Sequence, residues 1–166
     1  MPDMLVQLLK LPPMGEFEAT LTALRGQGVV IRRAHPFEST AIRQFIATNF
    51  SVGWADEVEP CYTRQPISLY IAIREGQVIG FAAYEATQRN FFGPTGVLES
   101  ERGTGIGKAL LLACMYGLRE MGYAYAIIAG VGPVPFYEKS VGASLIPDST
   151  PGIYTDMLKR APASES

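Results

Sequence analysis

Histidine and cysteine, the residues of most metal sites, are scarce in this sequence of 166 residues. The one histidine, His35, stands outside any cluster, and Cys61 and Cys114 lie far apart with no CxxC motif. We therefore expect no metal site and no Ser/His/Asp arrangement, and we interpret His35 as a structural or surface residue. Cys114 falls in an apolar helical run typical of a core. A single disulfide would be feasible, but free thiols in a reducing cytosol suit such a chain better.

Long apolar runs and an excess of one charge are missing as well. No stretch of about 18 apolar residues could cross a membrane, and Met1–Met4 does not begin the basic and apolar regions of a secretory signal. The net charge is −2, with Lys and Arg scattered, which argues against a nucleic-acid surface. Hydrophobic residues make up 48% and charged residues 18%, as in globular rather than disordered chains. We expect a soluble, cytoplasmic protein with no nucleic-acid and no membrane partner.

The chain divides into three parts by its patterns. Residues 1–28 look like an N-terminal extension with a short strand-like run and a helix, residues 29–160 form one main domain, and residues 161–166 are interpreted as a disordered tail. In the main domain we expect strands at residues 29–33, 68–74, 78–85, 90–99, 125–130, 143–146 and 153–158. Helices are expected at residues 37–50, 103–121 and 135–141, with a further short helix within 51–60.

The order of these elements predicts an α/β fold with one mixed central sheet flanked by helices. Residues 68–74 and 78–85 are separated by Glu75-Gly76-Gln77, which is typical of a β-hairpin. Residues 90–99 and 125–130 flank a crossover helix and should therefore run parallel. The last two strands should form a terminal hairpin.

The most informative stretch joins a strand to the long helix, and it consists of Arg102, Gly103, Thr104, Gly105, Ile106, Gly107 and Lys108. A helix begins with backbone N–H groups that lack partners, and its dipole adds partial positive charge. Glycines let the backbone turn tightly and let a diphosphate approach without a Cβ in the way. Arg102 and Lys108 add positive side chains. We interpret the turn as an anion-binding site rather than a purely structural turn.

Two nucleotide motifs fail on this turn. A P-loop would need glycine in place of Arg102 and a hydroxyl in place of Ala109, and a dinucleotide fingerprint would need glycine in place of Lys108. The pattern R/Q-x-x-G-x-G/A does fit, with Arg102, Gly105 and Gly107. Through this pattern and the order of its strands, the sequence resembles the GNAT superfamily of N-acetyltransferases over about residues 29–160.

The resemblance implies acetyl-CoA as co-substrate, bound through its pyrophosphate at residues 102–108, and no metal. It also implies that the strand before the turn carries a bulge and separates from the next parallel strand, so that the pantetheine arm pairs with the freed main chain. Gly93-Pro94-Thr95-Gly96 suits such a bulge, although a simple break between two short strands would look the same. Main-chain N–H groups around Val97 and Leu98 would then polarise the thioester carbonyl.

Further along, Phe136-Tyr137-Glu138-Lys139 with Gly142 is similar to the family's F-Y-x-K-x-G-F segment. In the family the tyrosine commonly protonates the leaving thiolate, and this role is carried over to Tyr137 as a general acid. The alternative is that Tyr137 only packs within a short helix. An asparagine that often precedes this helix is absent, because the residues there are Gly132-Pro133-Val134-Pro135.

A general base is harder to assign. Some relatives use a glutamate in the strand before the turn, but here only Glu99, at its end, is available as a catalytic candidate. Glu85 on the preceding strand could also act through water and is counted among the substrate-side residues, and both acids could equally be exposed ion-pair partners. Trp54, Glu57 and Tyr154 complete the expected acceptor contacts. An acidic lining would suit a cationic amine, although packing roles are as plausible for Trp54 and Tyr154.

These observations predict an N-acetyltransferase that transfers acetyl from acetyl-CoA to a primary amine by direct attack in a ternary complex. The acceptor would be a small-molecule or peptide amine, and a homodimer would be compatible with the sequence. Because no base is assigned firmly, a GNAT-fold module that binds acyl-CoA or a protein partner without turnover stays open.

Overall fold

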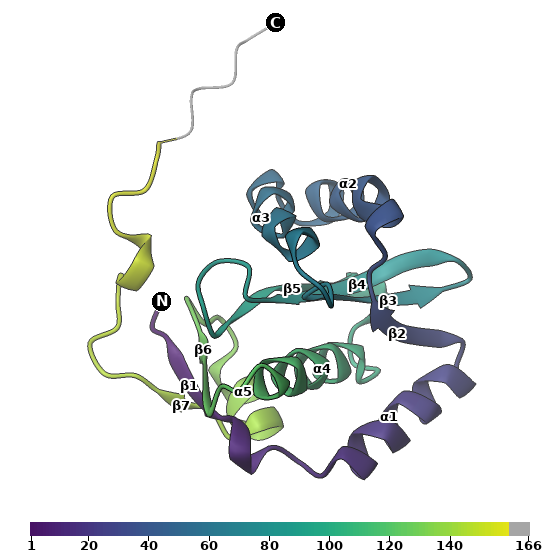
Figure 1. Cartoon of the computed structure of the whole chain (residues 1–166), viewed down its shortest axis with the longest axis horizontal. Helices are drawn as coiled ribbons and strands as arrows, with labels where there is room; N and C mark the ends of the chain where they lie inside the picture. Colours follow the sequence, from purple (N-terminus) through teal and green to yellow (C-terminus); the bar gives the residue numbers. More distant parts are fainter. Residues whose placement is uncertain (160–166) are drawn as a thin grey trace, which may run out of the picture.

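Residues 1–159 are described by a computed structural model of the chain, and they form one mixed seven-stranded sheet with helices on both faces (Figure 1). Its strand order is β2-β3-β4-β5-β6-β1-β7. Neighbouring strands pair antiparallel except β5 and β6, which run parallel. The predicted fold class, the hairpin and the parallel pair are therefore confirmed. The strands are β1 (Met4–Gln7), β2 (Val29–Arg33), β3 (Leu69–Arg74), β4 (Gln77–Tyr84), β5 (Phe91–Val97), β6 (Tyr125–Ile128) and β7 (Ser144–Leu145).

Five α-helices and several 3-10 helices connect the strands. The α-helices are α1 (Met14–Gly26), α2 (Ser39–Asn49), α3 (Val52–Glu57), α4 (Ile106–Glu120) and α5 (Val134–Val141). The 3-10 helices are Leu8–Lys10, Pro36–Glu38, Glu59–Thr63, Glu99–Glu101 and Gly152–Tyr154. Within residues 1–159, no helix is long and apolar enough to cross a bilayer. The predicted tail at residues 161–166 lies outside the described residues.

Helix α4 is the centre of the larger core. Its residues from Ala109 to Leu118 are all buried, and a helix that is apolar on every side needs cover on every side. Strands β3, β4 and β5 cover one side, and α1 with Leu8–Lys10 covers another. In Figure 1, α2 and α3 lie on the opposite face of the sheet from α4 and α1. Cys114 lies in this larger core, and Cys61 lies in a second, smaller core. Both cysteines are free and buried.

The N-terminal strand β1 lies inside the sheet rather than beside it. Met4 is aligned with Ile128 of β6 on one side and with Leu145 of β7 on the other. The terminal hairpin predicted from residues 143–146 and 153–158 is therefore wrong. Residues Gly152–Tyr154 form a 3-10 helix, and residues 155–159 form no strand. The hairpin therefore fails because its second strand does not form, and β7 pairs with β1 at the edge of the sheet.

Two predicted boundaries shift around the glycine-rich turn. The strand predicted at residues 90–99 ends at Val97, and the helix predicted from residue 103 begins at Ile106. Gly103 and Gly105 have φ angles of 80° and 89°. These left-handed values suit glycine and do not belong to a right-handed helix, so α4 begins only after the turn.

Candidate functional site

Strands β5 and β6 separate soon after they begin. They are paired only at Phe91 with Ile127 and at Phe92 with Ile128. After Phe92 come Gly93, with a φ of 115°, and Pro94, which has no N–H to donate. The pairing of β5 with β4 also shifts register between Ala82 and Tyr84. The bulge predicted in this strand is thus present, and the two parallel strands diverge beyond it.

A groove of about 750 Å³ lies where these strands diverge. It is lined by residues of β5, of the start of α4, of the segment after β6, and of α5. The lining residues are Met1, Trp54, Phe92, Gly93, Pro94, Thr95, Gly96, Val97, Arg102, Gly103, Gly105, Gly107, Lys108, Leu111, Ile128, Ala129, Gly130, Val131, Gly132, Pro133, Phe136 and Tyr137. The groove therefore brings the predicted anion-binding turn and Tyr137 to one continuous surface.

The start of α4 presents unpaired N–H groups to this groove. The first helical hydrogen bond runs from the Ala109 N–H to the Gly105 carbonyl at 3.0 Å, so the N–H groups of Ile106, Gly107 and Lys108 have no helical partner. Their partial positive charge adds to the helix dipole. A Cβ on Gly107 would lie 3.8 Å from Val97 Cγ2 and 4.0 Å from Phe136 Cζ. Glycine at this position therefore keeps the groove open over the helix terminus.

Three residues of the predicted anion-binding turn have side chains that are buried or hydrogen-bonded within the protein. The Ile106 side chain is buried in the core, so only its main chain is available to the groove. Thr104 is exposed and its hydroxyl donates to the Glu101 carbonyl at 2.8 Å. Arg102 is exposed and its Nε donates to the Val97 carbonyl at 3.2 Å, which fixes the base of its side chain beside the groove.

The direction of the main-chain N–H groups along β5 follows from its register. The Leu98 N–H donates to the Ile79 carbonyl at 2.9 Å, so it points toward β4 and away from the groove. Because N–H directions alternate along a paired strand, the Val97 N–H points the other way, toward the gap between β5 and β6. Of the two N–H groups predicted from sequence, the structure brings Val97 to the groove and leaves Leu98 outside it.

Tyr137 lies at the point where the strands part. Its ring lies edge-to-face against Phe92, the last residue of β5 that pairs with β6, with ring centroids 6.3 Å apart, and against Phe136 at 5.1 Å. Tyr137 is only 7% exposed. Burial raises the pKa of its phenol above the ordinary value, so the hydroxyl keeps its proton at neutral pH.

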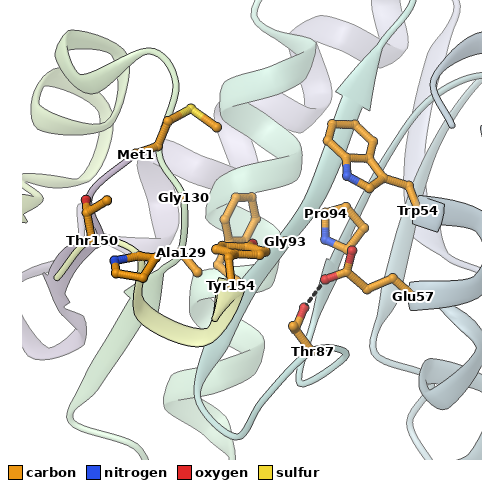
Figure 2. A pocket seen from close by; sticks show the side chains of 12 residues that line it. Met1, Trp54, Glu57, Thr87, Gly93, Pro94, Ala129, Gly130, Thr150 and Tyr154 are labelled. Carbon is orange, nitrogen blue, oxygen red and sulfur yellow. Dashed lines mark hydrogen bonds between the residues drawn. The ribbon is translucent and has the colours of Figure 1, made fainter. Parts of the chain in front are cut away.

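A second cavity of about 420 Å³ adjoins the groove, and seven residues line both of them: Met1, Trp54, Phe92, Gly93, Pro94, Ala129 and Gly130. We call it the acidic pocket. It is lined by Met1, Trp54, Glu57, Thr87, Phe92, Gly93, Pro94, Ala129, Gly130, Thr150, Pro151 and Tyr154. Figure 2 shows Trp54 and Glu57 on one side and Tyr154 on the other, with Gly93 and Pro94 between them. Three of the four predicted substrate-side residues thus surround one cavity.

The two other predicted acids lie elsewhere. The Glu85 side chain is 1% exposed and faces Arg64 Nη1 at 3.5 Å. It also accepts the Asn90 N–H, so it anchors the loop between β4 and β5. Glu99 is exposed at the start of a 3-10 helix and lines neither cavity. The structure places neither carboxylate at the groove.

Sequence reasoning missed the contribution of the N-terminus to this site. Oδ1 of Asp3 accepts the Gly130 N–H at 3.0 Å, and the Asp3 N–H donates to Ser149 Oγ at 2.8 Å. The Pro2 carbonyl accepts the Val131 N–H at 2.9 Å. These bonds fix the segment after β6 and the segment that carries Tyr154. No local sequence pattern predicts these hydrogen bonds, because the partners lie more than 120 residues apart in the chain.

Within the described part of the chain, no three His, Cys, Asp or Glu side chains gather as metal ligands would.

Comparison with solved structures shows the same fold in several proteins. The glucosamine N-acetyltransferase region of a fungal multi-domain GH3 β-N-acetylglucosaminidase matches with a TM-score of 0.69 and 18% identity, over 87% of this chain and 19% of that one. A GCN5-related N-acetyltransferase from Sphaerobacter thermophilus matches with a TM-score of 0.65 and 17% identity, over 87% of this chain and 48% of that one. The chain thus spans about a fifth and about half of the length of these two proteins.

A third structure, a GNAT family acetyltransferase from Brucella melitensis in complex with acetyl-CoA, matches with a TM-score of 0.54 and 21% identity, over 71% of this chain and 86% of that one. No curated protein matches the sequence. The sequence model of the acetyltransferase (GNAT) family matches residues 39–143, which is more than half of the chain. The chain therefore belongs to the acetyltransferase (GNAT) family of acyltransferase enzymes.

Proposed function

We propose that the chain transfers an acetyl group from acetyl-CoA to a primary amine while both substrates are bound. The observation that carries this proposal is the junction of two cavities at Phe92, Gly93 and Pro94. One cavity leads to the positively charged start of α4, and the other contains a carboxylate. A thioester in the first would face an amine in the second at the point where β5 and β6 separate.

Acetyl-CoA would lie along the groove with its pyrophosphate at the start of α4. The unpaired N–H groups of Gly107 and Lys108 and the exposed charges of Arg102 and Lys108 suit a diphosphate. The pantetheine arm would follow β5 through the gap between β5 and β6. Solved relatives with the same fold hold acetyl-CoA, in the Brucella melitensis protein, and CoA, in an Escherichia coli protein.

In the reaction, the amine nitrogen attacks the thioester carbonyl carbon and forms a tetrahedral intermediate. Main-chain N–H groups of β5 that face the gap, with Val97 as the assigned donor, stabilise the oxyanion. The carbon–sulfur bond then breaks, Tyr137 gives its proton to the departing thiolate, and its phenolate regains a proton from water. The proton lost by the amine passes to water at the mouth between Trp54 and Tyr154, which are 37% and 43% exposed. Neither Glu99 nor Glu85 takes part in the proposed reaction, since neither residue lines a cavity.

The alternative is a module that binds acyl-CoA without turnover. A thiol-release assay of the purified chain with acetyl-CoA and a panel of primary amines, amino sugars and peptides separates the two. We expect amine-dependent release of the CoA thiol with at least one class of acceptor. Binding of acetyl-CoA without any amine-dependent release would support the module, and absence of acetyl-CoA binding would refute the assignment of the groove.

A further inference from the structure

The two cavities carry opposite charge. The groove has two cationic side chains among its lining residues, Arg102 and Lys108, and the acidic pocket has none. The acidic pocket instead contains one carboxylate, Glu57. Within residues 1–159, Glu57 forms no ion pair with a lysine or arginine, whereas its neighbours Asp56 and Glu59 both pair with Arg43. Glu57 is thus the one charged side chain among the lining residues, and its carboxylate makes the side-chain lining of the pocket negative.

Glu57 and Trp54 are presented together by α3. They are three residues apart, so they lie on the same face of this helix. The Thr87 hydroxyl donates to Oε1 of Glu57, which fixes the carboxylate against the loop after β4 (Figure 2). Trp54 is held in turn by stacking on Phe50 at 5.8 Å and by an edge contact to Phe81 at 6.2 Å. The carboxylate and the indole are thus positioned before any substrate arrives.

The remaining walls of the pocket are apolar and partly aromatic. Phe92, Pro94 and Pro151 line it together with the ring of Tyr154. Burial, and then the negative charges of Glu57 and Asp3, raise the pKa of Tyr154, so its phenol is neutral and adds no charge. A flat apolar group between Trp54 and Tyr154 would contact aromatic surface on both sides, and a cation near these rings gains further attraction.

The size of the pocket limits what it can hold. Its volume of about 420 Å³ lies near the lower end of the range for ligand pockets, roughly 300–1,000 Å³. Residues Thr150, Pro151 and Tyr154 form its far wall, held in place by Asp3 and Ser149. No lysine or arginine side chain lines the pocket, so a substrate carboxylate would meet no such partner there and would be repelled by Glu57.

We propose that the acidic pocket selects small primary amines with an apolar or aromatic body and no carboxylate, and that Glu57 is the residue that binds their ammonium group. This inference rests on the proposed function, since it assigns the acceptor of the same site. The ammonium lies at Glu57 until it loses its proton to water, and the apolar body lies between Trp54 and Tyr154.

Two probes that differ in one group test this selection. Phenethylamine and L-phenylalanine share a ring and an amine, and only the second carries a carboxylate. We expect kcat/KM for phenethylamine to exceed that for L-phenylalanine by about 100-fold or more, as like charges in one pocket cost several kcal/mol. Equal rates for the two, or turnover with peptides or amino sugars alone, would overturn the inference while leaving the proposed function standing.

The variant Glu57→Gln removes the charge and keeps an amide oxygen to accept the Thr87 hydrogen bond. We expect KM for phenethylamine to rise about 10-fold or more, which corresponds to loss of a hydrogen bond to a charged group, with kcat and KM for acetyl-CoA changing less than about threefold. Glu59→Gln is the matched control, because it removes the same charge two residues away, outside both cavities, and should leave these constants unchanged. A collapse of kcat with KM unchanged would contradict an ammonium-binding role.

Calorimetry measures amine binding at Glu57 directly and does not require turnover. The wild-type chain, saturated with CoA, is titrated with phenethylamine, and Glu57→Gln is titrated in the same way. Binding that weakens about 10-fold in the variant would support the ammonium site even if no turnover is found. Binding that is equal in the two proteins, or absent in both, would overturn it.

Discussion

At the scale of single residues, Tyr137 and Val97 define where chemistry can occur. The Tyr137 phenol lies among aromatic rings, and the groove passes directly beside it. Burial raises its pKa, so it stays protonated through neutral and mildly alkaline pH and can act as an acid there. The Val97 N–H faces the same gap from β5. In the proposed reaction, Tyr137 donates a proton and the Val97 N–H stabilises negative charge.

The variant Tyr137→Phe tests the proton donor. It removes the hydroxyl and keeps the ring that packs against Phe92 and Phe136, so we expect unchanged KM for acetyl-CoA and a fall in kcat of about 100-fold, the lower end of general acid catalysis. Tyr125→Phe is the control, since Tyr125 is 53% exposed on β6 and lines neither cavity. Steady-state rates of thiol release give the answer. Turnover unchanged in Tyr137→Phe would mean that the thiolate is protonated by another group.

At the scale of elements, the start of α4 explains why this turn is rich in glycine. Gly103 and Gly105 adopt left-handed backbone angles, so their replacement would strain the turn itself. Gly107 has no such constraint and lies as the second residue of the helix. Glycine at position 107 leaves the groove over the start of α4 free of a side chain. The two kinds of glycine can therefore be separated by experiment.

Gly107→Val should weaken acetyl-CoA binding without loss of the fold. Valine has a higher helix propensity than glycine by a few tenths of a kcal/mol, and its side chain would fill the groove between Val97 and Phe136. We expect the Kd measured by calorimetry to rise about 100-fold, which a displaced pyrophosphate with two lost charge-assisted hydrogen bonds would produce. Gly15→Val is the matched control, because Gly15 is the second residue of α1 with no heavy atom near its Cβ position. Equal affinity in all three proteins would refute the binding site at α4.

The residue before β1, Asp3, makes a second contribution at this scale. Asp3→Ala removes the acceptor for the Gly130 N–H, and we expect the free energy of unfolding to fall by about 1–3 kcal/mol and the acceptor KM to rise several-fold. Asp3→Asn keeps an oxygen that can accept this N–H and should restore most of both values. Denaturant unfolding and steady-state kinetics measure the two effects. An acceptor KM that is unchanged in Asp3→Ala would show that β1 only stabilises the sheet.

At the scale of the whole molecule, the site lies at the carboxyl ends of the parallel strands, where ligands of α/β sheets commonly bind. Local patterns predicted the elements that build it: the apolar run of α4, the hairpin of β3 and β4, and the turn from Arg102 to Lys108. These features depend on residues close in the chain, so they could be predicted from the sequence.

Features that depend on register or on distant pairing could not be predicted. The placement of β1 between β6 and β7 is fixed by residues at opposite ends of the chain, and the strand predicted at residues 153–158 does not form. The Leu98 N–H faces β4 because of a register that a shift of one residue would invert. Glu85 was predicted as a substrate-side residue, but in the structure its side chain is buried, pairs with Arg64 and accepts the Asn90 N–H.

The proposed reaction requires acetyl-CoA and an amine to be bound together, with direct transfer between them. Initial rates measured over a matrix of both substrate concentrations, with the CoA thiol and the N-acetyl product quantified in the same reactions, test this most directly. We predict intersecting double-reciprocal lines, equal amounts of thiol and N-acetylated amine, and a chain of unchanged mass. Parallel lines with an acetylated chain would indicate a covalent intermediate, and thiol release without N-acetylated amine would contradict acetyl transfer to an acceptor.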